Sequence, residues 1–143
     1  MIRLASVALL LAVALPVAAQ PDPAKALEGK YTLVSLTVAG KALDRPAKDR
    51  ETFVLRDGKL FAVSADGKKE DPMTLKFDGA KVDFTEPDRK GGPHMVGVYK
   101  LDGKTLTFCF VESDKTADRP KDVTATGGGV VTLVLARVAD EKK

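Results

Sequence analysis

Cysteine and histidine are almost absent from this chain of 143 residues, which contains one of each, Cys109 and His94. A single cysteine excludes an internal disulfide, so the fold must be stabilised by packing alone. A closed structural zinc site needs four protein ligands, and carboxylates here are scattered without a metal-binding spacing. The composition therefore predicts no metal and no other cofactor.

An excess of charge of one sign is also lacking. Lysine and arginine number 23 against 20 aspartate and glutamate residues, and the formal net charge is +3. Nucleic-acid binding needs a concentrated basic face, and binding to an anionic membrane needs a polybasic cluster. Neither is present, so we expect no nucleic-acid partner and no electrostatic membrane anchor.

The N-terminus has the three-part layout of a secretory signal peptide. Arg3 precedes an uncharged apolar run over residues 4–17, and small residues follow up to Ala19. The run is shorter than the roughly 20 apolar residues that span a bilayer. We expect a signal peptide at 1–19, cleavage after Ala19, and export of a single domain, residues 20–143, to the periplasm or the extracellular space. No stable membrane anchor is expected after cleavage.

Long segments of helical periodicity are missing beyond residue 19. Only residues 42–50, with Pro46 near the start, are expected to form a helical turn. The pair Asp-Gly recurs instead, and it favours the positive φ angles of tight hairpin turns. These pairs occupy 57–58, 66–67, 78–79 and 102–103. The expected strands are 30–38, 51–56, 59–65, 70–77, 80–85, 94–101, 104–111 and 130–138.

The Asp-Gly pairs also predict hairpin registers. A two-residue turn at 78–79 would pair Phe77 with Ala80 and place apolar side chains on one face. In the hairpin over 51–64 both faces are apolar, and the interior set is expected to be Phe53, Leu55, Leu60 and Ala62. A turn at 102–103 would pair Gly97 with Phe108 and Val96 with Cys109. Tyr99 and Phe108 then face the interior, whereas Cys109 lies on the outer face beneath the loop 112–129.

Long and tight connections alternate along the chain. The long ones are 39–50, 65–69, 86–93 and 112–129, and the tight ones are the turns at 57–58, 78–79 and 102–103. In an up-and-down meander alternate connections lie at the same end, so the long loops would gather at one end. Pairing of the last strand with the first predicts an all-β fold, an eight-stranded antiparallel up-and-down barrel with an open mouth and a narrow base.

This arrangement resembles the lipocalin-like barrels. Those proteins carry Gly-x-Trp on the first strand, with a basic residue of the last strand stacked on the indole. Here Gly29-Lys30-Tyr31 stands at the matching place, and the last strand ends at Arg137. We therefore expect Gly29, Tyr31 and Arg137 to form a structural marker at the base, with a cation–π contact between Arg137 and Tyr31.

The C-terminal half resembles a family of secreted lipocalin-like domains that is abundant in planctomycetes. The pattern is carried by GVYKLDGKTLTFCF at 97–110, by Arg119-Pro120 and by GGGVVTLVLAR at 127–137. Tyr31 replaces a tryptophan of the family pattern, and Val98 replaces an isoleucine. The resemblance spans Leu27 to Arg137, makes Gly97 and Cys109 further structural markers, and implies an exported lipocalin-like domain with no catalytic residues to carry over.

Few residues suggest a catalytic or phosphate-binding site. A cysteine nucleophile needs a base, and the predicted register would place His94 on the diagonal from Cys109. No third residue orients this histidine, so burial of Cys109 is the favoured interpretation and enzymatic activity is not expected. The glycine run 127–129 lacks the Lys-Ser/Thr of a phosphate-binding loop.

The function we expect is the binding of a small apolar or amphipathic ligand at the loop-rich mouth. Candidate contacts are Tyr99 and Phe108 inside the barrel and Arg119 in the longest loop. For Arg119, bracing of its own loop by a nearby carboxylate is the favoured interpretation. The alternative function is a protein-interaction or inhibitor domain with a filled barrel, which would use the mouth loops.

Overall fold

The computed structural model describes residues 22–43, 51–64, 66–88, 90–91 and 94–139. Its elements are α1 (Pro23–Ala26), β1 (Gly29–Val38), β2 (Lys41–Leu43), β3 (Thr52–Arg56), β4 (Lys59–Val63), β5 (Met73–Asp78), β6 (Lys81–Thr85), β7 (Met95–Asp102), β8 (Thr105–Glu112), the 3-10 turn η2 (Thr116–Asp118) and β9 (Val130–Arg137). The predicted signal segment 1–19 lies outside the described residues. So do residues 44–50 of the expected helical turn, whose positions 42 and 43 belong to strand β2 instead.

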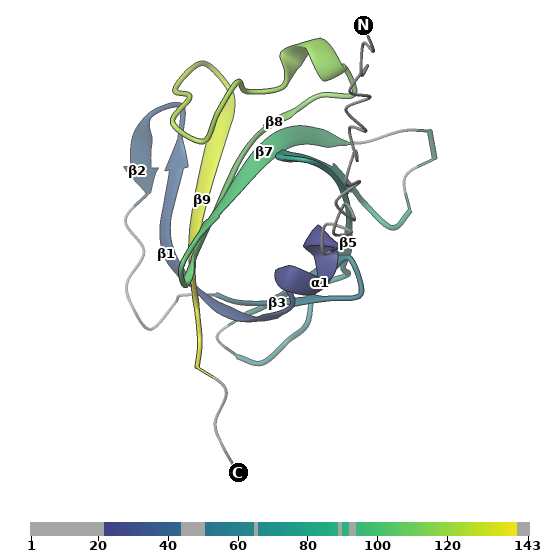
Figure 1. The fold of residues 1–143 in the computed structure, drawn as a ribbon, viewed down its shortest axis with the longest axis vertical. Coiled ribbons are helices and arrows are strands. Elements are labelled where there is room, and N and C mark those ends of the chain that lie inside the picture. Colours follow the sequence, from purple (N-terminus) through teal and green to yellow (C-terminus); the bar gives the residue numbers. More distant parts are fainter. Residues whose placement is uncertain (1–21, 44–50, 65, 89, 92–93, 140–143) are drawn as a thin grey trace, which may run out of the picture.

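The strands form a closed antiparallel barrel, which confirms the predicted fold (Figure 1). Consecutive strands from β3 to β9 pair with one another, and β1 pairs with both β3 and β9. The short strand β2 pairs only with the far half of β1, from Leu36 to Val38. Closure leaves eight strands in the wall and no long unpaired edge among the described strands.

A β-bulge in β1 explains how one strand lines the interior along its whole length. Leu33 pairs with Leu135 and Ser35 with Val134, so Val34 is an extra residue without a partner in β9. The extra residue shifts the alternation of side chains by one position. Leu33 before the bulge and Leu36 after it therefore both pack into the core, while Val34 is exposed.

The interior is an apolar core built from alternate residues of every strand of the wall, as period-two patterning requires. Its buried members are Leu27, Tyr31, Leu33, Phe53, Leu55, Leu60, Leu75, Val82, Phe84, Leu106, Phe108, Leu133 and Leu135. The predicted interior set of the hairpin over 51–64 is confirmed, because Ala62 packs against the same cluster.

Two of the three predicted hairpin registers are wrong by two residues. Asp78 pairs with Lys81 and Asp102 pairs with Thr105, so the turns occupy 79–80 and 103–104. In each, glycine is the first central residue with positive φ and the second residue has none, as in type II′ turns. The aspartates remain in the ladder. A shift of two keeps each side chain on its predicted face, which is why the fold prediction holds.

The third hairpin has the predicted register. Arg56 pairs with Lys59, and Asp57 and Gly58 both have positive φ, as a type I′ turn requires. Asp57 at the first central position is the feature that distinguishes this turn from the other two.

The base of the barrel is closed by α1 and by the predicted pair of Tyr31 and Arg137. The Arg137 guanidinium carbon lies 5.4 Å from the centroid of the Tyr31 ring, which confirms the expected cation–π contact. The Tyr31 hydroxyl donates to the carbonyl of Leu27 at 2.7 Å and accepts from Nη2 of Arg137 at 2.9 Å. Glycine suits position 29, because its φ of 153° is rare for other residues and a Cβ there would lie 3.3 Å from Nε of Arg137.

The longest connection, residues 113–129, lies outside the ring of strands in Figure 1. We call it the strap. It covers a second apolar cluster on the outer face of the barrel, which contains Val96, Val98 and Cys109 and is separate from the interior core. Cys109 is fully buried, and its Sγ lies 3.9 Å from the carbonyl oxygen of Ala125 in the strap. The predicted position of this cysteine is confirmed.

Candidate functional site

The half of the barrel opposite the base, which we call the upper half, contains a cavity of about 200 Å³ that opens between the long loops. We call it the mouth cavity. Its lining residues are Glu51, Phe53, Leu60, Ala62, Glu70, Asp71, Met73, Phe84, Met95, Phe110 and Leu133. Apolar side chains form the walls, and the charged ones are all acidic.

The walls of the mouth cavity follow from the strand pattern. Phe53 is the second residue of β3, and Met73 and Met95 are the first residues of β5 and β7, so each lies just after a long loop. Phe84 and Phe110 lie near the ends of β6 and β8, just before the next long loop. Because these positions all have interior parity, their side chains converge at one end of the barrel.

Below the mouth cavity the barrel is filled. Tyr31, Leu106, Phe108 and Leu135 are fully buried, and Leu27 from the segment after α1 plugs the base. Phe84 connects the two halves, since its ring lies 5.5 Å from that of Phe108 below and 5.0 Å from that of Phe110 above. Among the described residues, the interior is thus closed at the base and open toward the loops.

Two further hollows adjoin the mouth cavity. One, of about 360 Å³, shares Glu70, Asp71 and Met73 with it and continues along the loop after β6. The other, of about 390 Å³, shares Met95 and Phe110 with it and continues toward the strap. A molecule in the mouth cavity therefore has room for a polar group on either side of the opening.

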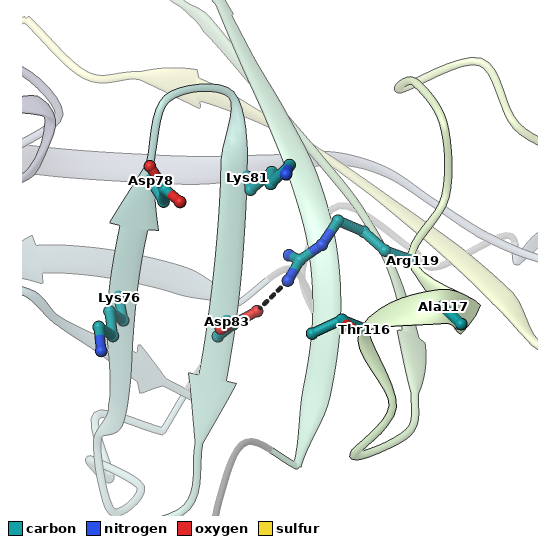
Figure 2. Close-up of a pocket in the computed structure, with 7 residues that line it drawn as sticks. All are labelled: Lys76, Asp78, Lys81, Asp83, Thr116, Ala117 and Arg119. Atoms are coloured by element: carbon teal, nitrogen blue, oxygen red, sulfur yellow. Dashed lines mark hydrogen bonds and ion pairs between the residues drawn. The ribbon is translucent and has the colours of Figure 1, made fainter.

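A separate groove of about 580 Å³ runs between the strap and the outer face of β5 and β6. Figure 2 shows its lining residues, Lys76, Asp78, Lys81, Asp83, Thr116, Ala117 and Arg119. Its charges are balanced across the sheet, because Lys76 stands opposite Asp83 and Asp78 opposite Lys81. Ala117 is the only apolar residue among the described lining residues, so this larger groove is a weaker candidate for a ligand site.

Arg119 braces the strap against the barrel wall. Its Nη1 donates to the carbonyls of Val82 and Gly97 at 3.1 and 2.8 Å. Its Nη2 donates to Asp83 Oδ1 at 2.7 Å, the contact drawn as a dashed line in Figure 2. The Arg119 side chain is only 12% exposed. Its donors are therefore directed at the sheet, away from the mouth cavity.

The three candidate contacts predicted from the sequence do not line the mouth cavity. Phe108 is fully buried in the filled half, and Tyr99 packs edge-on against Phe77 with ring centroids 5.1 Å apart. Burial raises the pKa of the Tyr99 hydroxyl. Arg119 lies on the outer face, where it lines the groove beside β5 and β6.

The predicted Cys109–His94 diagonal is wrong. Cys109 pairs with Val98, four residues along β7 from His94, a separation of about 13 Å at the rise of an extended strand. Burial raises the pKa of the Cys109 thiol, with a smaller opposing effect from the hydrogen bond that Thr132 donates to it. A protonated thiol without a base nearby is a poor nucleophile.

His94 lies at the mouth between two glutamates. Its Nε2 is 3.4 Å from Glu86 Oε1 and 3.5 Å from Glu112 Oε1. This contact joins the end of β6 to the end of β8 across the start of β7. Within the described ranges no three His, Cys, Asp or Glu side chains come together as metal ligands. None of the helices in those ranges is long and apolar enough to cross a bilayer.

Sequence reasoning missed the acidic residues of the mouth, Glu51, Glu70 and Asp71. Interior parity combined with the position of the long loops could have found the apolar walls. The acidic residues precede β3 and β5, where no periodicity dictates the direction of a side chain.

Comparison with known proteins found no matching family model, curated protein or solved structure. The functional argument for this chain therefore depends on its own geometry.

Proposed function

We propose that this protein binds a small, largely apolar molecule in the mouth cavity. The observation that carries this proposal is an apolar cavity of about 200 Å³ at the open end of a barrel whose other end is filled. Concave apolar sites with a few polar groups at the edge are typical of small-molecule binding.

The volume limits the size of the ligand. Drug-sized ligands occupy pockets of about 300–1,000 Å³, whereas an engineered cavity of about 150 Å³ binds benzene. The mouth cavity lies between these and suits one aromatic ring or a short branched alkyl group. Edge-to-face contacts with Phe53, Phe84 or Phe110 would add to the burial of such a ring.

The test uses indole and 2-phenylethanol as probes in a titration followed by amide chemical shifts. We expect saturable shifts at cavity residues such as Ala62 and Met73. In the variant Ala62→Leu, which fills the cavity from its wall, binding should weaken at least tenfold. The matched control is Ala42→Leu, the same change on the exposed strand β2. Absence of saturable shifts with either probe, or equal binding by the two variants, would overturn the proposal.

A protein-interaction or inhibitor domain is the alternative that the sequence leaves open. That function requires a filled barrel with only the loops available, and the open upper half of the interior favours a small ligand over it.

We also propose that the chain is exported, because of the apolar run and small residues at 1–19. The mature protein recovered from the periplasm or the medium should then begin at Gln20 by N-terminal sequencing. Retention of residues 1–19 in the recovered protein would contradict this. Membership of the secreted planctomycete family stays a prediction that the motifs at 97–110 and 119–120 support.

A further inference from the structure

We propose that the ligand of the mouth cavity is a small organic cation, a protonated amine attached to a single ring or short alkyl group. This inference depends on the proposed function and specifies the chemical class of the ligand. It comes from the charges around the opening, which are all negative among the described lining residues, unlike those of the outer groove and of the small hollow on β3 and β4.

The mouth cavity and its two adjoining hollows are lined by charge of one sign. Their charged lining residues are Glu51, Glu70, Asp71, Glu86, Asp88, Glu112 and Asp118. No lysine or arginine within the described ranges lines any of the three. The outer groove differs, because Lys76, Lys81 and Arg119 outnumber its two aspartates. The small hollow on β3 and β4 has only basic charges among its described lining residues, Arg56 and Lys69.

Glu70 and Asp71 lie where the mouth cavity meets the neighbouring hollow. They line both the mouth cavity and the hollow of about 360 Å³ beside it. Both side chains are exposed, and neither carboxylate pairs with a basic side chain in the part of the chain that the structure describes. By contrast, the carboxylates of Glu86 and Glu112 both contact Nε2 of His94, and Asp118 accepts a hydrogen bond from Ser113.

This placement matches the shape of an amphipathic amine. A ring held between Met73 and Phe84 would have its substituent directed toward Glu70 and Asp71, because these two carboxylates border the apolar walls. An ammonium group there would avoid the large desolvation penalty of burial in the core, since Glu70 and Asp71 are both exposed to solvent. A carboxylate at the same position would face like charges.

The expected discrimination is moderate. An exposed ammonium–carboxylate pair contributes a few-fold to affinity, so two pairs should favour an amine over a neutral isostere by about 5- to 10-fold at low salt. The preference should shrink as salt is added, because exposed charges are screened over about 10 Å at 0.1 M ionic strength.

The experiment compares three probes of nearly equal size by the same chemical-shift titration: 2-phenylethylamine, 2-phenylethanol and 3-phenylpropionate. The wild-type protein should bind the amine most tightly, the alcohol about 5- to 10-fold more weakly and the carboxylate most weakly. The double variant Glu70→Gln/Asp71→Asn should bind the amine and the alcohol equally, with the alcohol affinity unchanged.

The matched control is Asp78→Asn/Asp102→Asn, which removes the same charge from exposed positions at the opposite end of the barrel. It should keep the preference for the amine. If the control loses it as well, overall charge rather than the mouth is responsible, and the inference is overturned.

The remaining outcomes separate this inference from the proposed function. Equal binding of amine and alcohol by the wild-type protein, or preference for the carboxylate, overturns the cationic ligand while the binding cavity stands. Failure of all three probes to produce saturable shifts overturns both. The wild-type comparison decides the matter even if the double variant fails to fold.

Discussion

Removal of the Arg119 guanidinium should release the strap and expose Cys109. Arg119 makes three hydrogen bonds to the wall, two to carbonyls and one to the Asp83 carboxylate. Hydrogen bonds to charged groups contribute about 1.5–3 kcal/mol each in favourable cases. Asp83 is 27% exposed, so the ionic part is weakened by solvent. We expect Arg119→Ala to lower the free energy of strap opening by about 2–3 kcal/mol.

The assay is the rate of alkylation of the single thiol under native conditions. A loss of about 2 kcal/mol in opening free energy should accelerate alkylation on the order of 30-fold, since 1.4 kcal/mol corresponds to a factor of ten. Because there is only one cysteine, the whole signal reports on Cys109. Arg119→Lys should give an intermediate rate, because an ammonium cannot donate to both carbonyls and Asp83 at once.

The control for this experiment is Lys121→Ala, an exposed charge two residues further along the strap. Its alkylation rate should equal that of the wild-type protein. If Arg119→Ala and the wild-type protein are alkylated at the same rate, the strap is not held by Arg119 and the reasoning fails.

Three further predictions concern stability. Gly97→Ala should lower the free energy of unfolding in urea by about 1–3 kcal/mol, because its Cβ would lie 2.5 Å from the carbonyl oxygen of Cys109, whereas Gly128→Ala, with open space around it, should change little. Tyr31→Phe should cost about 1–3 kcal/mol in the same assay, since the buried carbonyl of Leu27 loses its donor. The raised pKa of the Cys109 thiol stabilises the fold fully below the pKa of an unfolded cysteine, and this contribution should fall as pH rises from there through the raised pKa. Cys109→Ala should abolish that pH dependence in urea unfolding between the ordinary thiol and tyrosine pKa values, since above the latter the raised pKa of Tyr99 acts in the same direction. An unchanged profile in this interval would show that another group is responsible.

The turns show where local sequence is insufficient. Each Asp-Gly pair permits two hairpin registers that differ by two residues, with aspartate either in the turn or as the last residue of the strand. Both registers place the same side chains inside, so neither burial nor patterning distinguishes them. The register decides whether Cys109 can meet His94, and the observed one places His94 away from the diagonal of Cys109.

The candidate site was only partly predictable. Interior parity and long loops indicated an open end, and the walls around Phe53, Met73 and Phe110 follow from that. Arg119 was expected to brace its own loop through a carboxylate of that loop; it does act as a brace, but its partners are Asp83 on β6 and two carbonyls of the barrel wall. The carboxylates of Glu70 and Asp71 come from a connecting segment, and their place at the opening depends on how the loop packs.

The sequence alone determined the barrel. Period-two alternation specifies which side chains enter the core, and the order of long and tight connections specifies which end is open, because both are properties of neighbouring residues along the chain. Only the tertiary structure decided how far the interior is filled, where the strap lies and which charges surround the mouth. These depend on contacts between residues far apart in sequence, such as Arg119 with Gly97 or Tyr31 with Arg137, and on side-chain volumes that must fit together in three dimensions.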